Sequence, residues 1–175
     1  MPVKLQGATA LVKALRAVEP ILAKNTTREI AAALRPVTVK ARGYLPSNAD
    51  APSGWLQRPN AKGRWANRFY DKATASKGIS FKSTPSKPNR RGFVALASIF
   101  NRSAGGAIYE TAGRKSGNVG NFTPRLGGQL KGDKQKMTGR AIFRAFEEDQ
   151  GKAQDGVVKA IEKAAAKFDS MKDKV

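Results

Sequence analysis

The sequence predicts an α+β domain in which N-terminal helices and a C-terminal helix pack on a small antiparallel sheet, with two long irregular arms. Apolar residues recur at helical spacing near both ends of the chain, and short apolar runs of strand length lie in the middle. Two Gly-, Pro- and base-rich stretches, at about 46–76 and 112–136, show no period and form the expected arms. The 175 residues fit a single domain over 1–175.

The first expected helix covers residues 7–18. Its apolar residues recur at steps of three and four and therefore share one face: Ala8, Leu11, Val12, Leu15 and Val18. Glu19-Pro20 should interrupt it, because the residue before a proline is disfavoured in the α region.

A longer helix is expected next, carrying one apolar stripe: Ile30, Leu34, Val37, Ala41 and Tyr44. Thr26 and Glu29 have the spacing of a capping box, although Ile21-Leu22 could extend the helix backward. Pro36 should kink the helix or force a new start, since proline lacks an amide donor. Gly43 and Pro46 should end it.

Three strands are expected in an antiparallel meander. Residues 78–82 alternate apolar and polar side chains, and residues 92–100 form an almost unbroken apolar run that is typical of a central strand covered on both faces. Residues 107–110 should start the third strand, after a turn over 101–106.

The chain closes in helix. Apolar residues begin at 142 and recur as far as Phe168, while Gly151 and Gly156 each cost about 1 kcal/mol relative to Ala in a helix interior. One helix and two helices both fit this pattern.

The chain is strongly basic and lacks two residue types that carry much enzyme chemistry. It has 33 Lys and Arg against 13 Asp and Glu, a formal charge of +20, and no His or Cys. Residues 55–102 hold eleven of the bases and one acid, whereas residues 141–175 are neutral, with seven bases and seven acids. The surplus favours a polyanion or an acidic protein as partner.

We therefore expect no enzyme, no cofactor and no metal site. A chain without His or Cys has no imidazole base, thiolate nucleophile or ordinary zinc site. The glycines of 113–117 lack the spacing of a phosphate-binding P-loop. No apolar stretch is long enough to cross a bilayer, so no membrane partner is expected.

Two sets of residues are candidates for contacts with partners. Glu110, the only acid between Asp71 and Asp133, should form a structural or intersubunit salt bridge. The candidates for subunit contacts are Trp55, Trp65, Phe69, Tyr70, Glu110 and Arg114. The candidates for contacts with DNA phosphates or an acidic partner are Arg58, Lys62, Arg64, Arg68, Arg90, Arg91, Lys115, Lys131 and Lys134.

Four short segments carry a family resemblance: 41–46 (ARGYLP), 51–56 (APSGWL), 107–113 (AIYETAG) and 139–142 (GRAI). In these the chain resembles the tail-completion or head–tail joining proteins of long-tailed, non-contractile bacteriophages. The two arms are long for that family, which leaves open whether the position is tail completion, tail terminator or head-side connector.

The resemblance implies a structural protein of the virion neck, assembled in the host cytoplasm. It would form a homo-oligomeric ring between the portal-side connector and the tail terminator or tail tube, with double-stranded DNA passing through the lumen and bound without sequence preference. The residues by themselves leave an alternative open: a sequence-independent nucleic-acid-binding protein, of nucleoid type or part of a ribonucleoprotein.

Overall fold

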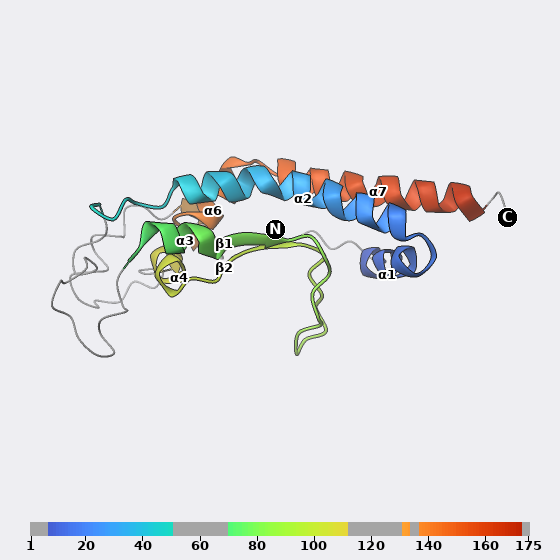
Figure 1. The fold of residues 1–175 in the computed structure, drawn as a ribbon, viewed down its shortest axis with the longest axis horizontal. Coiled ribbons are helices and arrows are strands. Elements are labelled where there is room, and N and C mark those ends of the chain that lie inside the picture. The colour runs from blue at the N-terminus through green and yellow to red at the C-terminus, as the bar shows by residue number, and fades with distance from the viewer. Residues whose placement is uncertain (1–6, 51–69, 112–130, 134–136, 173–175) are drawn as a thin grey trace. The chain divides into compact units, whose positions relative to one another are not determined.

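The computed structural model describes residues 7–50, 70–111, 131–133 and 137–172 (Figure 1). The described chain is mostly helical with small two-stranded sheets, which agrees with the predicted α+β class. It divides into two compact units. Unit 1 comprises residues 1–36, 81–98 and 151–175, and unit 2 comprises residues 37–80 and 99–150. That the chain behaves as a single domain stays a prediction.

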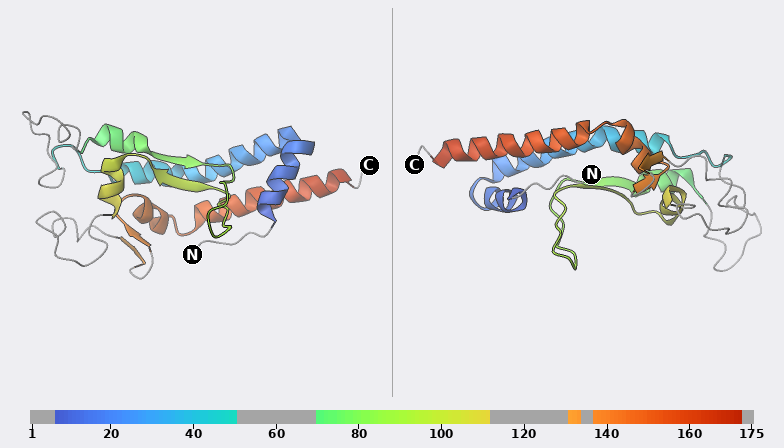
Figure 2. Two further views of the ribbon diagram at one scale, coloured as in Figure 1. Left: turned by 90° about the horizontal axis from the view of Figure 1, so that it is seen from below. Right: turned by 180° about the vertical axis from the view of Figure 1, so that it is seen from behind.

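Unit 1 is built on the helices from the two ends of the chain. Helix α1 (Ala8–Val18) ends where predicted, before Glu19-Pro20, and packs against α7 (Lys152–Lys172). The buried core joins residues of α1, α2 (Pro20–Gly43) and α7: Leu15, Leu22, Ala23 and Ala164, with Leu11 and Phe168 packed against them. Figure 2 shows α7 running alongside the first part of α2.

Helix α2 continues through Pro36, so the expected new start does not occur. It begins at Pro20, a favourable first position because the missing amide would be unpaired there anyway. Thr26 therefore lies inside the helix, where its hydroxyl donates to the Leu22 carbonyl rather than capping. The predicted apolar stripe is buried at Ile30, Leu34, Val37 and Ala41. The boundary between the two units falls directly after Pro36.

The C-terminal region forms two helices, α6 (Ile142–Glu148) and α7. Between them Gln150 and Gly151 have positive φ of 53° and 85°, a left-handed conformation that stops a helix and favours glycine. Gly156 was predicted to weaken the helix at this junction, but it lies inside α7 and has another role. A Cβ on Gly156 would lie 2.8 Å from the Cβ of Ala33, so this glycine allows α7 to pack closely against α2.

The predicted three-stranded meander is wrong. Strands β1 (Ile79–Lys82) and β2 (Ser98–Asn101) form one two-stranded sheet, and β1 lies where it was predicted. Only the end of the apolar run 92–100 is strand. The run is not covered on both faces, because the residues of β2 are only half-buried and Phe93 is 52% exposed. It is also not a central strand, since β1 is the only strand beside it among the described residues.

Residues 107–110, predicted as a third strand, belong to α4 (Ala104–Thr111). The Ser103 hydroxyl accepts the Gly106 amide at 3.0 Å and so caps the start of α4, which favours helix over strand. Gly106 has no room for a side chain, since a Cβ would lie 2.6 Å from that same hydroxyl oxygen. Helix α4 packs against α3 within unit 2.

Parts of the two predicted arms form regular structure. The first ends in α3 (Lys72–Gly78), which Asp71 caps by accepting the Thr74 amide at 2.8 Å. The second ends in β3 (Lys131–Asp133), which pairs antiparallel with β4 (Met137–Gly139), Lys131 opposite Gly139. Residues 51–69 and 112–130 lie outside the described residues.

Candidate functional site

Glu110 holds the start of α6 from the end of α4. Its Oε2 accepts the amides of Ala141 and Ile142 at 2.7 and 3.0 Å, and its Oε1 accepts the amide of Phe143 at 2.9 Å. The side chain is buried, and a Cβ on Gly139 would overlap its carboxylate. Glu110 was predicted to form a structural or intersubunit salt bridge, and the contacts that the structure describes for it are instead with backbone amides at a helix N-terminus.

A buried arginine stands beside this cap. Arg140 is only 1% exposed, and its guanidinium donates to the Tyr109 carbonyl at 2.7 Å and lies 5.8 Å from the Tyr109 ring centroid. Tyr109 in turn packs against Tyr70, with ring centroids 6.3 Å apart. Burial raises the pKa of both phenols, so both stay neutral and act as packing groups with a hydrogen-bonding hydroxyl.

Tyr70 and Glu110 were predicted as subunit contacts, and in this chain both are buried. The Tyr70 hydroxyl donates to the Pro46 carbonyl at 2.9 Å and ties residue 70 back to the end of the segment that follows α2. Each of the two residues therefore has an internal role within unit 2. The other candidate subunit contacts (Trp55, Trp65, Phe69 and Arg114) lie outside the described residues.

The surface of unit 2 carries a charged cluster that the sequence did not indicate. The Glu148 carboxylate accepts from Lys40 Nζ at 2.8 Å, from Arg144 Nε at 3.0 Å and from the Tyr44 hydroxyl. The Arg144 guanidinium lies over the Tyr44 ring, 3.9 Å from its centroid. Hydrogen bonds from Lys40, Tyr44 and Arg144 lower the pKa of Glu148 to about 2. Lys40 and Glu148 are 108 positions apart, so no local spacing could reveal the cluster.

Residues 83–97 of unit 1 form a hairpin that connects β1 and β2 and carries two arginines at its tip. Figure 1 shows it extending away from the helices of its unit. The Ser86 amide donates to Ala95 O at 2.8 Å, and the Asn89 amide donates to Phe93 O at 3.0 Å. Residues 87–93 are all exposed, including Arg90 and Arg91. This is where the structure places two of the predicted phosphate contacts, on one tight turn.

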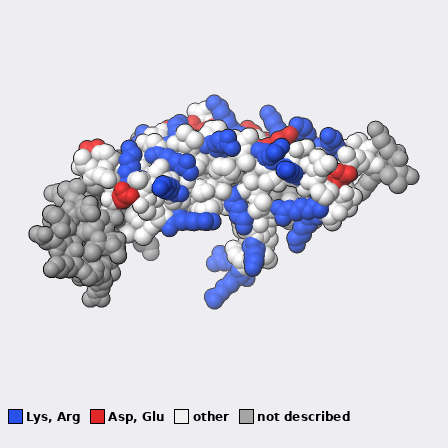
Figure 3. Space-filling view, in the orientation of Figure 1, with Lys and Arg blue, Asp and Glu red and all other residues white. Residues whose placement is uncertain are grey.

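The remaining predicted phosphate contacts are not described at the level of side chains. Lys131 lies in β3, while Arg58, Lys62, Arg64, Arg68, Lys115 and Lys134 lie outside the described residues. Lys and Arg outnumber the acids on the face that Figure 3 shows. Arg90 and Arg91 are therefore the predicted phosphate contacts whose side-chain surroundings the structure describes.

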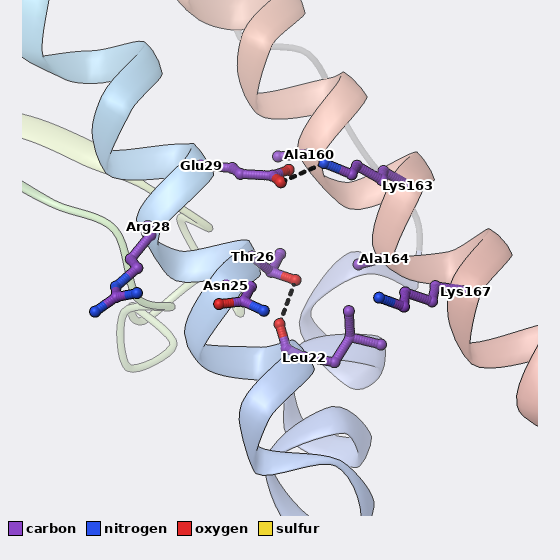
Figure 4. Close-up of a pocket in the computed structure, with 9 residues that line it drawn as sticks. All are labelled: Leu22, Asn25, Thr26, Arg28, Glu29, Ala160, Lys163, Ala164 and Lys167. Carbon is purple, nitrogen blue, oxygen red and sulfur yellow. Dashed lines mark hydrogen bonds and ion pairs between the residues drawn. The ribbon is translucent and has the colours of Figure 1, made fainter.

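Unit 1 also has a pocket between α2 and α7, with a cavity volume of about 290 Å³ (Figure 4). Lys163 Nζ and Glu29 Oε1 pair across it at 2.5 Å. Arg28 points away from α7, and the Thr26 hydroxyl is bonded to the Leu22 carbonyl. Glu29 and Lys163 are thus paired with each other and Arg28 is directed outward, and we do not assign the pocket a ligand.

Neither a metal site nor a membrane span emerges from the described ranges. Within them, no three or more Asp, Glu, His or Cys side chains gather where they could hold a metal ion. The helices of the described chain are also too short or too polar to cross a membrane.

No protein-family model, curated protein sequence or solved structure matches the chain.

Proposed function

We propose that the chain is a structural protein of the bacteriophage neck, which forms a homo-oligomeric ring between the portal-side connector and the tail terminator or tail tube. Double-stranded DNA would pass through the lumen of this ring. The proposed location is the virion, after assembly in the host cytoplasm, and the proposed role involves no catalysis.

The observation that carries the proposal is the contact between Glu110 and the start of α6. Two of the segments that resemble neck proteins, 107–113 and 139–142, are separated in the sequence by the 25 residues 114–138. The Glu110 carboxylate joins them through three amides, and the absence of a side chain at Gly139 makes room for it. Their residue types thus have one shared physical purpose, which supports treating them as parts of a single motif.

This contact also fixes both ends of the basic segment 112–138. Residue 111 ends α4 and residue 139 ends β4, and Glu110 with Arg140 bind these ends to each other. We expect this basic segment to be one of the parts that contact neighbouring subunits or rings.

Exposed apolar side chains support contacts with other protein chains. Val18 and Ile21, at the corner between α1 and α2, are 65% and 73% exposed. Burying such side chains at a subunit boundary would contribute about 25 cal/mol per Å² of apolar surface.

Native mass spectrometry and negative-stain microscopy of the nuclease-treated protein test the proposal. The expected result is a closed ring of one defined copy number, alone or on addition of the portal-side or tail-tube protein encoded beside it. Val18→Ser with Ile21→Ser should shift the distribution toward monomer. Val39→Ser, an exposed valine on the unit 2 part of α2, is the matched control. A protein that stays monomeric with every such partner would refute the neck assignment.

A free, sequence-independent nucleic-acid-binding protein is the second candidate, and the exposed Arg90–Arg91 turn favours it. This alternative requires tight binding to DNA or RNA by the isolated monomer or dimer. Affinity should fall by roughly 10³–10⁵ between about 50 and 200 mM salt if six to ten phosphates are contacted. Such binding without any ring would favour this candidate over the neck protein.

A further inference from the structure

We propose that the hairpin of residues 83–97, with the end of β1 at Lys82, is the element that contacts double-stranded DNA, with Arg90 and Arg91 entering a groove and binding its phosphates. This inference rests on the proposed function for its partner, since the ring would bring duplex DNA to the protein. It goes further by assigning the contact to one element and by predicting how each residue at the tip contributes.

The tip of the hairpin holds its two arginines in a fixed position. The Gly92 amide donates to Asn89 O at 2.9 Å, and the Asn89 side-chain oxygen accepts the amides of Arg91 and Phe93 at 2.9 and 3.0 Å. Gly92 has φ of 72°, which a residue with a side chain adopts only under strain. This is a type I turn closed by a left-handed glycine, a common hairpin connection. Arg90 and Arg91 occupy its two central positions, so little backbone entropy is lost when they bind.

The charge of the hairpin is all of one sign. Lys82, Lys87, Arg90 and Arg91 lie between residues 79 and 101, and no acid lies between Asp71 and Glu110. All four side chains are exposed. The described ion pairs of the chain involve other bases, namely Lys40, Arg144 and Lys163. These four charges are therefore available to a polyanion from outside the chain.

The shape of the hairpin favours duplex DNA over an acidic protein surface. A two-stranded ribbon fits the major groove, which is about 12 Å wide, and arginines presented on a narrow turn can also enter the minor groove. Phe93, 52% exposed, stands one residue beyond the turn, and apolar side chains beside arginines contact sugars and bases in groove-binding proteins. An acidic protein surface would require no projecting ribbon and no exposed aromatic ring.

The test is a titration of the full-length protein against a fluorescently labelled duplex at several salt concentrations. Wild type is compared with Arg90→Ala/Arg91→Ala and with Arg16→Ala/Arg35→Ala, which removes two exposed arginines from α1 and α2 of the same unit. Phe93→Ala is measured as a third variant, and circular dichroism checks that each variant is folded.

Loss of two phosphate contacts should lower the slope of log affinity against log salt by about 2 and weaken binding on the order of tenfold or more at low salt. The control pair should change the slope by less than half as much. Phe93→Ala should weaken binding with no change in slope, because it removes an apolar contact and releases no counterion. Two duplexes of unrelated sequence should give the same dissociation constants.

The inference is overturned if wild type does not bind duplex DNA, or if the two arginine pairs change the slope equally. It is also overturned if poly-aspartate binds as tightly as DNA and loses as much affinity in Arg90→Ala/Arg91→Ala, since the partner would then be an acidic protein. Ring formation is measured separately by native mass. If the protein forms a ring but the two arginine pairs change the salt slope equally, only the inference about the hairpin fails. If the salt slope depends on Arg90 and Arg91 but no ring forms, only the neck assignment fails.

Discussion

A 2.7 Å hydrogen bond joins the Glu110 carboxylate to the Ala141 amide, 31 positions later in the sequence. Through it, a side chain at the end of α4 caps the start of α6. The first amides of a helix lack partners within the helix and carry the positive end of its dipole, so a carboxylate is well placed there. Ala141, the residue at the cap position of α6, cannot supply an oxygen from its own side chain. Glu110 takes over that role from the end of α4.

Glu110→Gln should destabilise the protein by about 2 kcal/mol, as expected when charged hydrogen bonds are lost and buried amides keep only one acceptor oxygen. Urea unfolding followed by circular dichroism measures the loss. Glu147→Gln, on the exposed surface of α6, removes the same charge from the same region and should have little effect. Equal effects of the two substitutions would show that the cap contributes nothing specific.

Gly139→Ala should act on the same contact from the other side. The added Cβ would overlap the Glu110 carboxylate and approach the Phe143 ring to 2.7 Å, and overpacking of this kind typically costs 1–3 kcal/mol, with about 2 kcal/mol expected here. Hydrogen exchange at the amides of residues 141–143 should accelerate. In a Glu110→Ala background, where the carboxylate is gone and only the approach to Phe143 remains, the same substitution should cost clearly less, and strict additivity would contradict the contact.

Periodicity in the sequence was enough to predict the elements whose packing depends on their own apolar face. The stripe of α2 and the stop at Glu19-Pro20 are local patterns, and the structure buries or ends the helices accordingly. The alternation that predicts β1 is also local. These features require no knowledge of what lies beside them.

Short segments whose state depends on a helix cap or on a distant partner could not be predicted in this way. Residues 107–110 are too few to separate a strand from a helix, and the decisive Ser103 cap lies before a pair of glycines that resembles a turn. The apolar run 92–100 was wrongly predicted as a doubly covered central strand, because an apolar composition reports neither what packs on each face nor how many strands lie beside it. The Glu148 cluster likewise joins α2 to α6, helices that are far apart in the sequence.

Gly156→Ala should destabilise unit 1 even though alanine is the better helix former by about 1 kcal/mol. The new Cβ would lie 2.8 Å from the Ala33 Cβ, a methyl group on a helix backbone that cannot move aside without shifting α2 against α7. A net loss of about 1 kcal/mol is expected after the gain in propensity, from the usual cost of overpacking. Thermal unfolding measures it.

The matched control for this contact is Ala33→Gly in the Gly156→Ala background. Removing the Ala33 methyl group restores the space, so the double variant should regain part of the stability despite the glycine introduced into α2. If Ala33→Gly costs the same with or without Gly156→Ala, the two positions do not touch and the close approach of the helices is refuted.

The pH dependence of stability should reveal the Glu148 cluster. Its hydrogen bonds with Lys40, Tyr44 and Arg144 lower the pKa of Glu148 from 4.5 to about 2. Because the pKa is lower in the folded state, the stabilisation is complete above the unfolded value and is lost as the pH falls from about 4.5 toward 2. The difference in melting temperature between wild type and Glu148→Gln should therefore be constant near neutral pH and narrow across that window.

The effect of salt on stability should distinguish the Glu148 cluster from the buried cap formed by Glu110. Glu148, Lys40 and Arg144 are all partly exposed, so added salt should screen their attraction and narrow the same difference at neutral pH. The loss caused by Glu110→Gln should change far less with salt, because that carboxylate is buried against backbone amides. The opposite result would be a difference in melting temperature between wild type and Glu148→Gln that stays the same down to about pH 2 or does not respond to salt. That result would show that the side chain acts through packing and not through its charge.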